Sequence, residues 1–370
     1  MRILAINWQD LKNPQAGGAE VHLQEILKRI AAQGNEITLL CSSFDGAIEK
    51  EEIDNIRIIR KGSRYNFNLV LPFILRSILQ KEKYDIVIED INKIPFYSPL
   101  FHNLPLLVVI PHLFATTIFK EINFALGLYI YFSEKPIPCV YRDKQFMVIS
   151  ESTKEDLVRR GIREENIFVV KCGIDHQLYK PGREKYSFPA IIYVGRIKKY
   201  KSIQDLILAF RLVLQRLPDS KLFIIGEGDY LSHLKKLSKQ LGLEDKIEFT
   251  GYVSQEEKVE RLQSSHLAVC PSLKEGWGLT NVEANACGTV VVASNVPGLK
   301  DSVVDGKTGL LFRYGDIEDL AKKILNVLSN KSLEDKLIQG GLEWARNFSW
   351  DEAANQTLNL INLTLNKNRD

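Results

Sequence analysis

The sequence lacks the features that mark membrane-spanning, disulfide-stabilised and zinc-binding proteins. Its five cysteines are odd in number and widely spaced, and no C-x-x-C pair occurs, so neither a zinc site nor a disulfide framework is indicated. The first residues form a strand-like run without the apolar core of a signal peptide. The most apolar segment, residues 104–119, is interrupted by Pro111 and His112, so we expect no helix that crosses a bilayer. A reducing cytoplasm fits these absences best.

The chain also lacks an excess of either charge. It has 49 lysines and arginines against 46 aspartates and glutamates, a net charge of +3, and no basic run of five or six residues, so we expect no nucleic-acid partner. With 45% apolar and 26% charged residues, the composition is that of an ordinary globular protein. A length of 370 residues exceeds one ordinary core and suits two α/β domains. We place their boundary at the polar linker 181–185, which gives domains 1–180 and 181–349.

A strand, a glycine-containing turn and a helix follow one another at the N-terminus. Residues 2–7 are predicted as a strand, and Gly17 and Gly18 open an amphipathic helix that reaches about residue 32. Such a helix start can attract phosphate, although structural glycines at a tight turn explain the pair equally well. His112 follows the predicted strand 106–110 and therefore lies at the same edge of a parallel sheet. A lone histidine is more often structural, but this position favours a ligand contact.

The second half repeats this arrangement with more charge. The strand 190–194 leads into the basic turn 195–201, where Arg196 offers a planar fork to a diphosphate and Lys201 adds a point charge. Solvated lysines in a connecting loop are the alternative interpretation. The strand 221–225 ends at Gly226, and the strand 247–250 leads to Val253. All these turns follow strands, at the edge where open α/β sheets bind ligands.

The stretch 266–312 carries the most specific pattern. The strand 267–270 passes through a loop with Glu275 and Gly278 into a helix that begins near Thr280, and a β-branched strand follows at 289–293. Glu283 lies in the first turns of the helix, with seven residues between it and Glu275. Such a loop can hold a ligand with phosphates at one end and hydroxyls at the other. A helix start with favourable acidic residues is the alternative.

The sequence EGWGLTNVEANACGTVVVAS, residues 275–294, closely resembles the signature of retaining glycosyltransferases of family 4. The resemblance covers nearly the whole chain and is poor only between residues 42 and 109. It implies the GT-B fold, in which two Rossmann-like, doubly wound parallel-sheet domains face each other across a cleft. The last helix, about residues 350–370, is then expected to cross back onto the N-terminal domain. One departure is Cys172, where relatives usually have asparagine, and no role is assigned to it.

The resemblance also implies roles for individual residues. Glu275 would hold the donor sugar and Glu283 the ribose, while Arg196 and Lys201 would neutralise the donor's phosphates. His112 would contact the donor sugar, and with Arg196, Lys201 and Glu275 it completes the candidate catalytic set. The full predicted donor site comprises Gly17, Gly18, Arg196, Lys201, Gly226, Val253, Glu275, Gly278, Leu279, Thr280 and Glu283.

The expected activity is retaining transfer of a hexose from a nucleoside-diphosphate sugar to a saccharide or lipid-linked saccharide, in polysaccharide or glycan biosynthesis. A UDP-sugar such as UDP-glucose is favoured, with GDP-mannose next. No D-x-D motif occurs, and two cationic side chains can replace a magnesium ion, so we expect no metal and no cofactor. A nucleotide-sugar epimerase of the same fold and a non-catalytic nucleotide-sugar binding module are the alternatives.

The acceptor is expected to bind the N-terminal domain, chiefly between residues 66 and 142. Aromatic and basic residues alternate there, namely Phe114, Phe119, Lys120, Phe124, Tyr129, Tyr131 and Lys135. One interpretation is a surface that docks on the inner face of a membrane to reach a lipid-linked sugar. The other, which we favour, is core packing of two helices.

Overall fold

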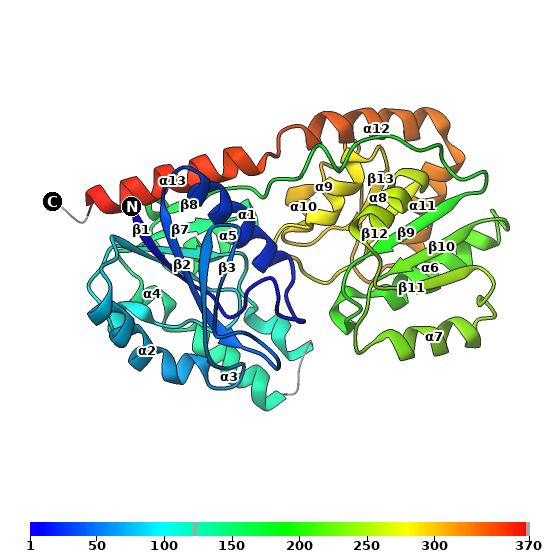
Figure 1. Ribbon diagram of the computed structural model, residues 1–370. Coiled ribbons are helices and arrows are strands. Elements are labelled where there is room, and N and C mark those ends of the chain that lie inside the picture. The colour runs from blue at the N-terminus through cyan, green and yellow to red at the C-terminus, as the bar shows by residue number, and fades with distance from the viewer. Residues whose placement is uncertain (121–123, 368–370) are drawn as a thin grey trace. The chain divides into compact units, whose positions relative to one another are not determined.

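The chain forms two units, each with its own parallel sheet and its own core. A computed structural model describes residues 1–120 and 124–367, except for the side chains of Thr116 and Lys120. Unit 1 comprises Met1–Gly173 and Trp350–Asp370, and unit 2 comprises Ile174–Ser349 (Figure 1). This division falls shortly before the polar segment 181–185.

Unit 1 is built on an eight-stranded sheet in the order β3-β4-β2-β1-β5-β6-β7-β8. Its strands are β1 (Arg2–Ile6), β2 (Glu36–Ser43), β3 (Lys50–Ile53), β4 (Ile56–Ser63), β5 (Ile86–Asp90), β6 (Leu106–Ile110), β7 (Gln145–Val148) and β8 (Ile167–Val169). Neighbouring strands run parallel, except that β3 pairs antiparallel with β4. Every residue of β6 is buried, which explains its unbroken apolar sequence LLVVI, because helices cover both faces of such a sheet.

The helices of unit 1 include the last helix of the chain. They are α1 (Gly18–Ala32), α2 (Phe67–Lys81), α3 (Phe124–Glu134), α4 (Ile137–Val140), α5 (Glu151–Arg159) and α13 (Trp350–Lys367), with short 3-10 helices η1 (Ser98–Leu100), η2 (Ala115–Lys120) and η3 (Glu164–Asn166). Helix α13, red in Figure 1, lies beside α1. The ring of His22 is 6.1 Å from that of Trp350, and Arg29 forms an ion pair with Asp351 at 2.6 Å. The two ends of the sequence thus contribute to one core.

Unit 2 has a six-stranded, entirely parallel sheet in the order β11-β10-β9-β12-β13-β14. The strands are β9 (Ala190–Val194), β10 (Lys221–Ile225), β11 (Ile247–Gly251), β12 (Leu267–Cys270), β13 (Val290–Ser294) and β14 (Gly309–Phe312). The helices are α6 (Ile203–Leu214), α7 (Leu231–Gln240), α8 (Gln255–Ser264), α9 (Leu279–Ala286), α10 (Leu299–Ser302), α11 (Ile317–Ser329) and α12 (Lys331–Ala345), with the 3-10 helix η4 (Lys199–Lys201). Ser254, Asp316 and Asn330 begin α8, α11 and α12 as N-caps whose side chains accept a backbone N–H.

The predicted fold class is confirmed, since both units are α/β with doubly wound parallel sheets. The antiparallel strand β3 was missed, because Lys50, Glu51 and Glu52 offer no apolar alternation and the strand pairs with β4 through a hairpin at the edge of the sheet. Within the described part of the chain, no helix combines the length and the apolarity that crossing a membrane requires.

Candidate active site

Four neighbouring loops follow β9, β10, β11 and β12 at one edge of the unit 2 sheet. Their backbones approach closely: the N–H of Gly195 donates to the carbonyl of Ile225 at 3.0 Å, and that of Gly226 to the carbonyl of Gly251 at 2.9 Å. A Cβ at Gly226 would lie 2.0 Å from the carbonyl oxygen of Gly195, so only glycine fits this contact. The edge carries the predicted residues Arg196, Lys201, Gly226, Val253, Glu275 and Gly278.

Arg196 and Val253 lie on the loops of this edge without entering the core. Arg196 is exposed, and its backbone carbonyl accepts a hydrogen bond from the hydroxyl of Tyr193 at 3.0 Å. Val253 is half-buried and directly precedes Ser254, the N-cap of α8. The edge therefore presents a guanidinium on the loop after β9 and backbone groups on the loop after β11.

Lys201 and Glu275 form an ion pair that joins the loop after β9 to the loop after β12. Their side chains are only 14% and 17% exposed. Burial alone would lower the pKa of Lys201, but the charge of Glu275, together with smaller contributions from Tyr200 and Tyr193, outweighs burial and raises this pKa above the ordinary value. The ammonium therefore stays protonated, and it also lies 5.2 Å from the centre of the Tyr200 ring. Two residues predicted for the site are thus in direct contact.

The loop after β12 enters α9 at Gly278. This residue has a φ of +82°, and a Cβ on it would lie 2.7 Å from a methyl carbon of Leu299, so the turn requires glycine. Leu279 and Thr280 are the first residues of α9. Their N–H groups have no carbonyl partner within the helix, which makes this helix start suitable for an anion.

Glu283 lies on α9 and contacts a lysine that the sequence analysis did not select. Both of its carboxylate oxygens accept hydrogen bonds from the ammonium of Lys258 on α8, at 3.1 and 3.0 Å. The ring of Tyr179 is 5.0 Å from the same ammonium, and burial together with the charge of Glu283 raises the pKa of Tyr179 above its ordinary value. Neither residue could be found from the sequence, because a lone lysine in a helix and a lone tyrosine in a loop form no spacing pattern.

The residues predicted in unit 1 lie at the corresponding edge of its own sheet. Gly17 and Gly18 lie at the start of α1, where the N–H of Gly17 donates to the carboxylate of Glu20 at 2.7 Å. Glu20 also accepts a hydrogen bond from the side-chain amide of Asn92 at 3.0 Å. The backbone N–H of Gly17 is therefore already bonded to Glu20, an acid in the first turn of the same helix. His112 follows β6, with its ring 5.0 Å from that of Phe114. The structure therefore holds the predicted residues in two groups, one in each unit.

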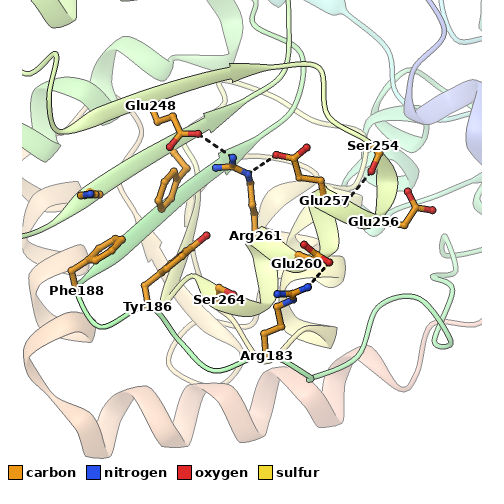
Figure 2. Close-up of a pocket in the computed structure, with 12 residues that line it drawn as sticks. Arg183, Tyr186, Phe188, Glu248, Ser254, Glu256, Glu257, Glu260, Arg261 and Ser264 are labelled. Carbon is orange, nitrogen blue, oxygen red and sulfur yellow. Dashed lines mark hydrogen bonds and ion pairs between the residues drawn. The ribbon is translucent and has the colours of Figure 1, made fainter.

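An open hollow of about 740 Å³ lies beside β10, β11 and α8 (Figure 2). Arg261 crosses it and forms ion pairs with Glu257 at 2.9 Å and with Glu248 at 3.0 Å. The predicted donor-site residues are not among those that line it. Among the described residues, no group of three or more His, Cys, Asp or Glu side chains is arranged to hold a metal ion.

The aromatic segment of unit 1 is partly exposed. Phe124 on α3 is 72% exposed, Tyr129 is 49% exposed, and Phe73 on α2 is 78% exposed. The side-chain amide of Asn68 donates to the hydroxyl of Tyr129 at 3.0 Å and joins the two helices. Core packing is therefore the wrong interpretation for Phe124 and Tyr129. Of the other residues in the predicted segment, Phe114, Phe119 and Tyr131 are half-buried, Lys135 is exposed, and the side chain of Lys120 lies outside the description.

Comparison with known families gives two adjoining matches. Residues 16–178 match the family described as Glycosyltransferase Family 4, and residues 179–344 match the family described as Glycosyl transferases group 1. Among curated proteins, a D-inositol 3-phosphate glycosyltransferase of a Nocardioides species is 28% identical, over 93% of this chain and 85% of its own length.

Solved structures resemble the chain over almost its full length. A sucrose-phosphate synthase of Thermosynechococcus elongatus has a TM-score of 0.83 at 22% identity and covers 98% of both chains. HepE of Anabaena, solved in complex with UDP-glucose, has a TM-score of 0.77 at 17% identity and covers 98% of this chain and 99% of its own. At these identities the likeness establishes the fold.

Proposed function

Since the chain belongs to glycosyltransferase family 4 and has the GT-B fold, we propose that it is a retaining hexosyltransferase that needs neither a metal ion nor a cofactor. The proposed donor is a nucleoside-diphosphate hexose, with UDP-glucose favoured and GDP-mannose next. The UDP-glucose complex of HepE supports UDP-glucose as the first choice of donor. The proposed acceptor is a saccharide or a lipid-linked saccharide, as in the synthesis of a polysaccharide or glycan.

The observation that carries the proposal is the pair of glutamates in unit 2, each in contact with a lysine. A donor lying along this edge would have its ribose at Glu283, its diphosphate at the start of α9, and its sugar at Glu275. Lys201 is already held by Glu275, so its charge needs little rearrangement when the donor binds. His112 would contact the donor sugar from unit 1.

Departure of the nucleoside diphosphate builds negative charge on its terminal phosphate. Arg196, Lys201 and the first N–H groups of α9 can stabilise this charge in place of a metal ion, and one well-placed donor is worth about 3–4 kcal/mol. In the proposed front-face displacement, the bond from C1 of the hexose to the phosphate oxygen breaks. The bond from C1 to the acceptor oxygen forms on the same face, and the acceptor's proton moves to the departing phosphate. Glu275 would stabilise the positive charge that grows at C1.

A lipid-linked acceptor agrees with the exposed face of α2 and α3. This face combines large apolar side chains with exposed bases, the composition of surfaces that lie on anionic membranes. Its members are Leu69, Phe73 and Arg76 on α2, and Phe124, Tyr129 and Phe132 on α3, with Lys135 directly after α3. We propose peripheral contact with the inner face of a membrane. The five free cysteines are consistent with the cytoplasm as the compartment.

Thermal unfolding with UDP, GDP or ADP at about 1 mM, with and without EDTA, tests the donor assignment. A ligand at 100 times its dissociation constant adds about 2.7 kcal/mol to the free energy of unfolding, which is readily measured. We expect UDP to stabilise the protein most, and EDTA to change nothing. Stabilisation by none of the three would contradict the assignment of Arg196, Lys201 and Glu283. Loss of stabilisation with EDTA would contradict metal independence.

A further inference from the structure

Lys258 is a half-buried cation whose ammonium contacts Glu283 and the ring of Tyr179. Its ammonium bonds both carboxylate oxygens, and the two side chains are only 16% and 8% exposed. The ammonium also lies over the ring of Tyr179, at 5.0 Å from its centre. Gln255, one turn earlier on α8, donates to the hydroxyl of Tyr179 at 2.6 Å and so fixes that ring. Three side chains, namely Lys258 and Gln255 on α8 and Tyr179 in the loop before β9, thus determine where the Glu283 carboxylate points.

Fold stability alone gives little reason for a lysine at this position. Lys258 lies near the start of α8, where the helix dipole opposes a positive charge. The free-energy cost of taking an ammonium and a carboxylate out of water can exceed the gain from their attraction. Apolar residues at such positions often give a fold of equal stability. The stacked ring and the bidentate contact keep the pair in one geometry, which is what a binding carboxylate requires.

We propose that Lys258 is a positioning residue for the donor, which holds the carboxylate of Glu283 in the orientation that accepts hydrogen bonds from the ribose of the nucleotide. This inference rests on the proposed donor site. An ionised carboxylate has about four acceptor positions, and the ammonium takes one on each oxygen. Capacity remains for a ribose hydroxyl. Lys258 does not itself touch the ligand and acts only through Glu283.

Binding of UDP and of 2′,3′-dideoxy-UDP to wild-type protein and to Lys258→Met tests the proposal. A hydrogen bond to a charged group contributes roughly tenfold or more to affinity, so the wild type should prefer UDP by about that factor. Methionine keeps the length of the side chain and removes its charge. Lys258→Met should weaken UDP by about tenfold and leave the dideoxy form within about twofold, so that the preference disappears. Equal weakening of both ligands, or an unchanged preference, would overturn the proposal.

Glu283→Gln and the double variant show whether the lysine acts through the glutamate. Glu283→Gln should lose the same preference, and adding Lys258→Met to it should cause no further loss. A further loss of several-fold in the double variant would show that Lys258 contacts the ligand itself, and would overturn the positioning role. Lys258→Arg retains the charge and should keep part of the wild-type preference for UDP. This variant tests the proposal even if Lys258→Met is unstable.

Arg261→Met is the matched control. Arg261 lies on the same helix, is 21% exposed and also forms ion pairs, but with Glu248 and Glu257 in the hollow of Figure 2. This variant should keep the wild-type preference for UDP. Wild-type protein that binds UDP and the dideoxy form equally well would refute the ribose assignment of Glu283 and this inference with it, while the phosphate contacts would stand. Absence of UDP binding in the wild type would instead refute the proposed UDP donor.

Discussion

Unit 1 and unit 2 are built on the same kind of sheet but differ in what they bury and what they expose. In unit 2, buried charges lie at the loop edge, where Lys201 pairs with Glu275 and Lys258 with Glu283. Among the described residues, all the exposed large apolar side chains except Tyr252 and Val304 belong to unit 1. Under the proposed function, unit 2 would bind the charged, hydroxylated donor and unit 1 would make the apolar contact.

The buried charges of unit 1 serve a different purpose. Arg60 on β4 is fully buried and forms an ion pair with Asp10, at 2.7 Å, in the loop that follows β1. Glu89 on β5 accepts from the hydroxyls of Ser98 and Tyr141, both at 2.5 Å, and burial raises its pKa. These contacts tie loops to strands. In unit 2, the half-buried Glu275 and the buried Glu283 lie on the loop and helix proposed to bind the donor, while the buried Glu334 lies on α12.

The largest expected effect is on the fold of unit 1. Asp10→Ala leaves the buried guanidinium of Arg60 without its main partner, and breaking such a pair costs about 3–5 kcal/mol of unfolding free energy. Hydrogen exchange should accelerate at the amides of β1, β2 and β4, while β9 to β14 keep their protection. Lys12→Met breaks an exposed ion pair of the same loop with Glu51 and should cost less than about 1 kcal/mol. Equal effects of both variants would refute the scaffolding role of Asp10.

The next effect is on turnover in unit 2. Glu275→Ala removes the carboxylate proposed to hold the donor sugar, so kcat should fall by about 100-fold or more while nucleoside-diphosphate affinity changes only several-fold. Steady-state kinetics and calorimetry measure the two quantities. Asp229→Ala, which breaks the exposed ion pair with Lys198 in the neighbouring loop, should leave both near wild type. Parallel loss of turnover and affinity after Glu275→Ala would favour a binding module over an enzyme.

A third expectation concerns the acid sensitivity of unit 1. Burial lowers the pKa of His22 from 6.5 to about 4, and neither ring nitrogen has a hydrogen-bond partner among the described residues. The unfolded chain therefore takes up a proton before the folded one, so stability is full above pH 6.5 and decreases as the pH falls to about 4, by about 3 kcal/mol. His22→Leu should flatten this dependence in denaturation curves measured from pH 7 to 4. An unchanged pH profile would contradict a buried, neutral imidazole.

The smallest change in stability is expected on the exposed face of α2 and α3. Replacing both Phe73 and Phe132 by serine should alter the unfolding free energy by less than about 0.5 kcal/mol for each site, because neither ring is buried. Sedimentation with vesicles that contain anionic lipid should fall several-fold. Val304→Ser, on unit 2, is the control and should leave vesicle binding unchanged. Equal binding of all three proteins would refute membrane contact through this face.

Elements whose requirements are local were predicted well. Strand β6 was predicted with its observed bounds, because an apolar run between turn residues needs little beyond its own sequence. Gly226 and Gly278 were recognised from the sequence as turn glycines. In the structure both have positive φ, and neighbouring atoms lie too close to either residue for a Cβ to fit. The spacing of Glu275 and Glu283 was also visible, since both lie within one loop and one helix.

Tertiary structure alone decided the partners and the exposed faces. The pair of Lys201 and Glu275 spans 74 positions, and that of Lys258 and Glu283 spans 25, so neither follows from helical or strand spacing. The sequence does not distinguish an aromatic residue that faces a core from one that faces solvent. The packing of α3 against its neighbours leaves Phe124 exposed. The sequence by itself determined the parallel α/β units and the sheet edge that carries the loops proposed to bind the donor, because backbone conformation and apolar periodicity depend on local sequence. Contacts between distant segments exist only in the folded chain. They decide which charged side chains pair and which apolar faces stay exposed to solvent.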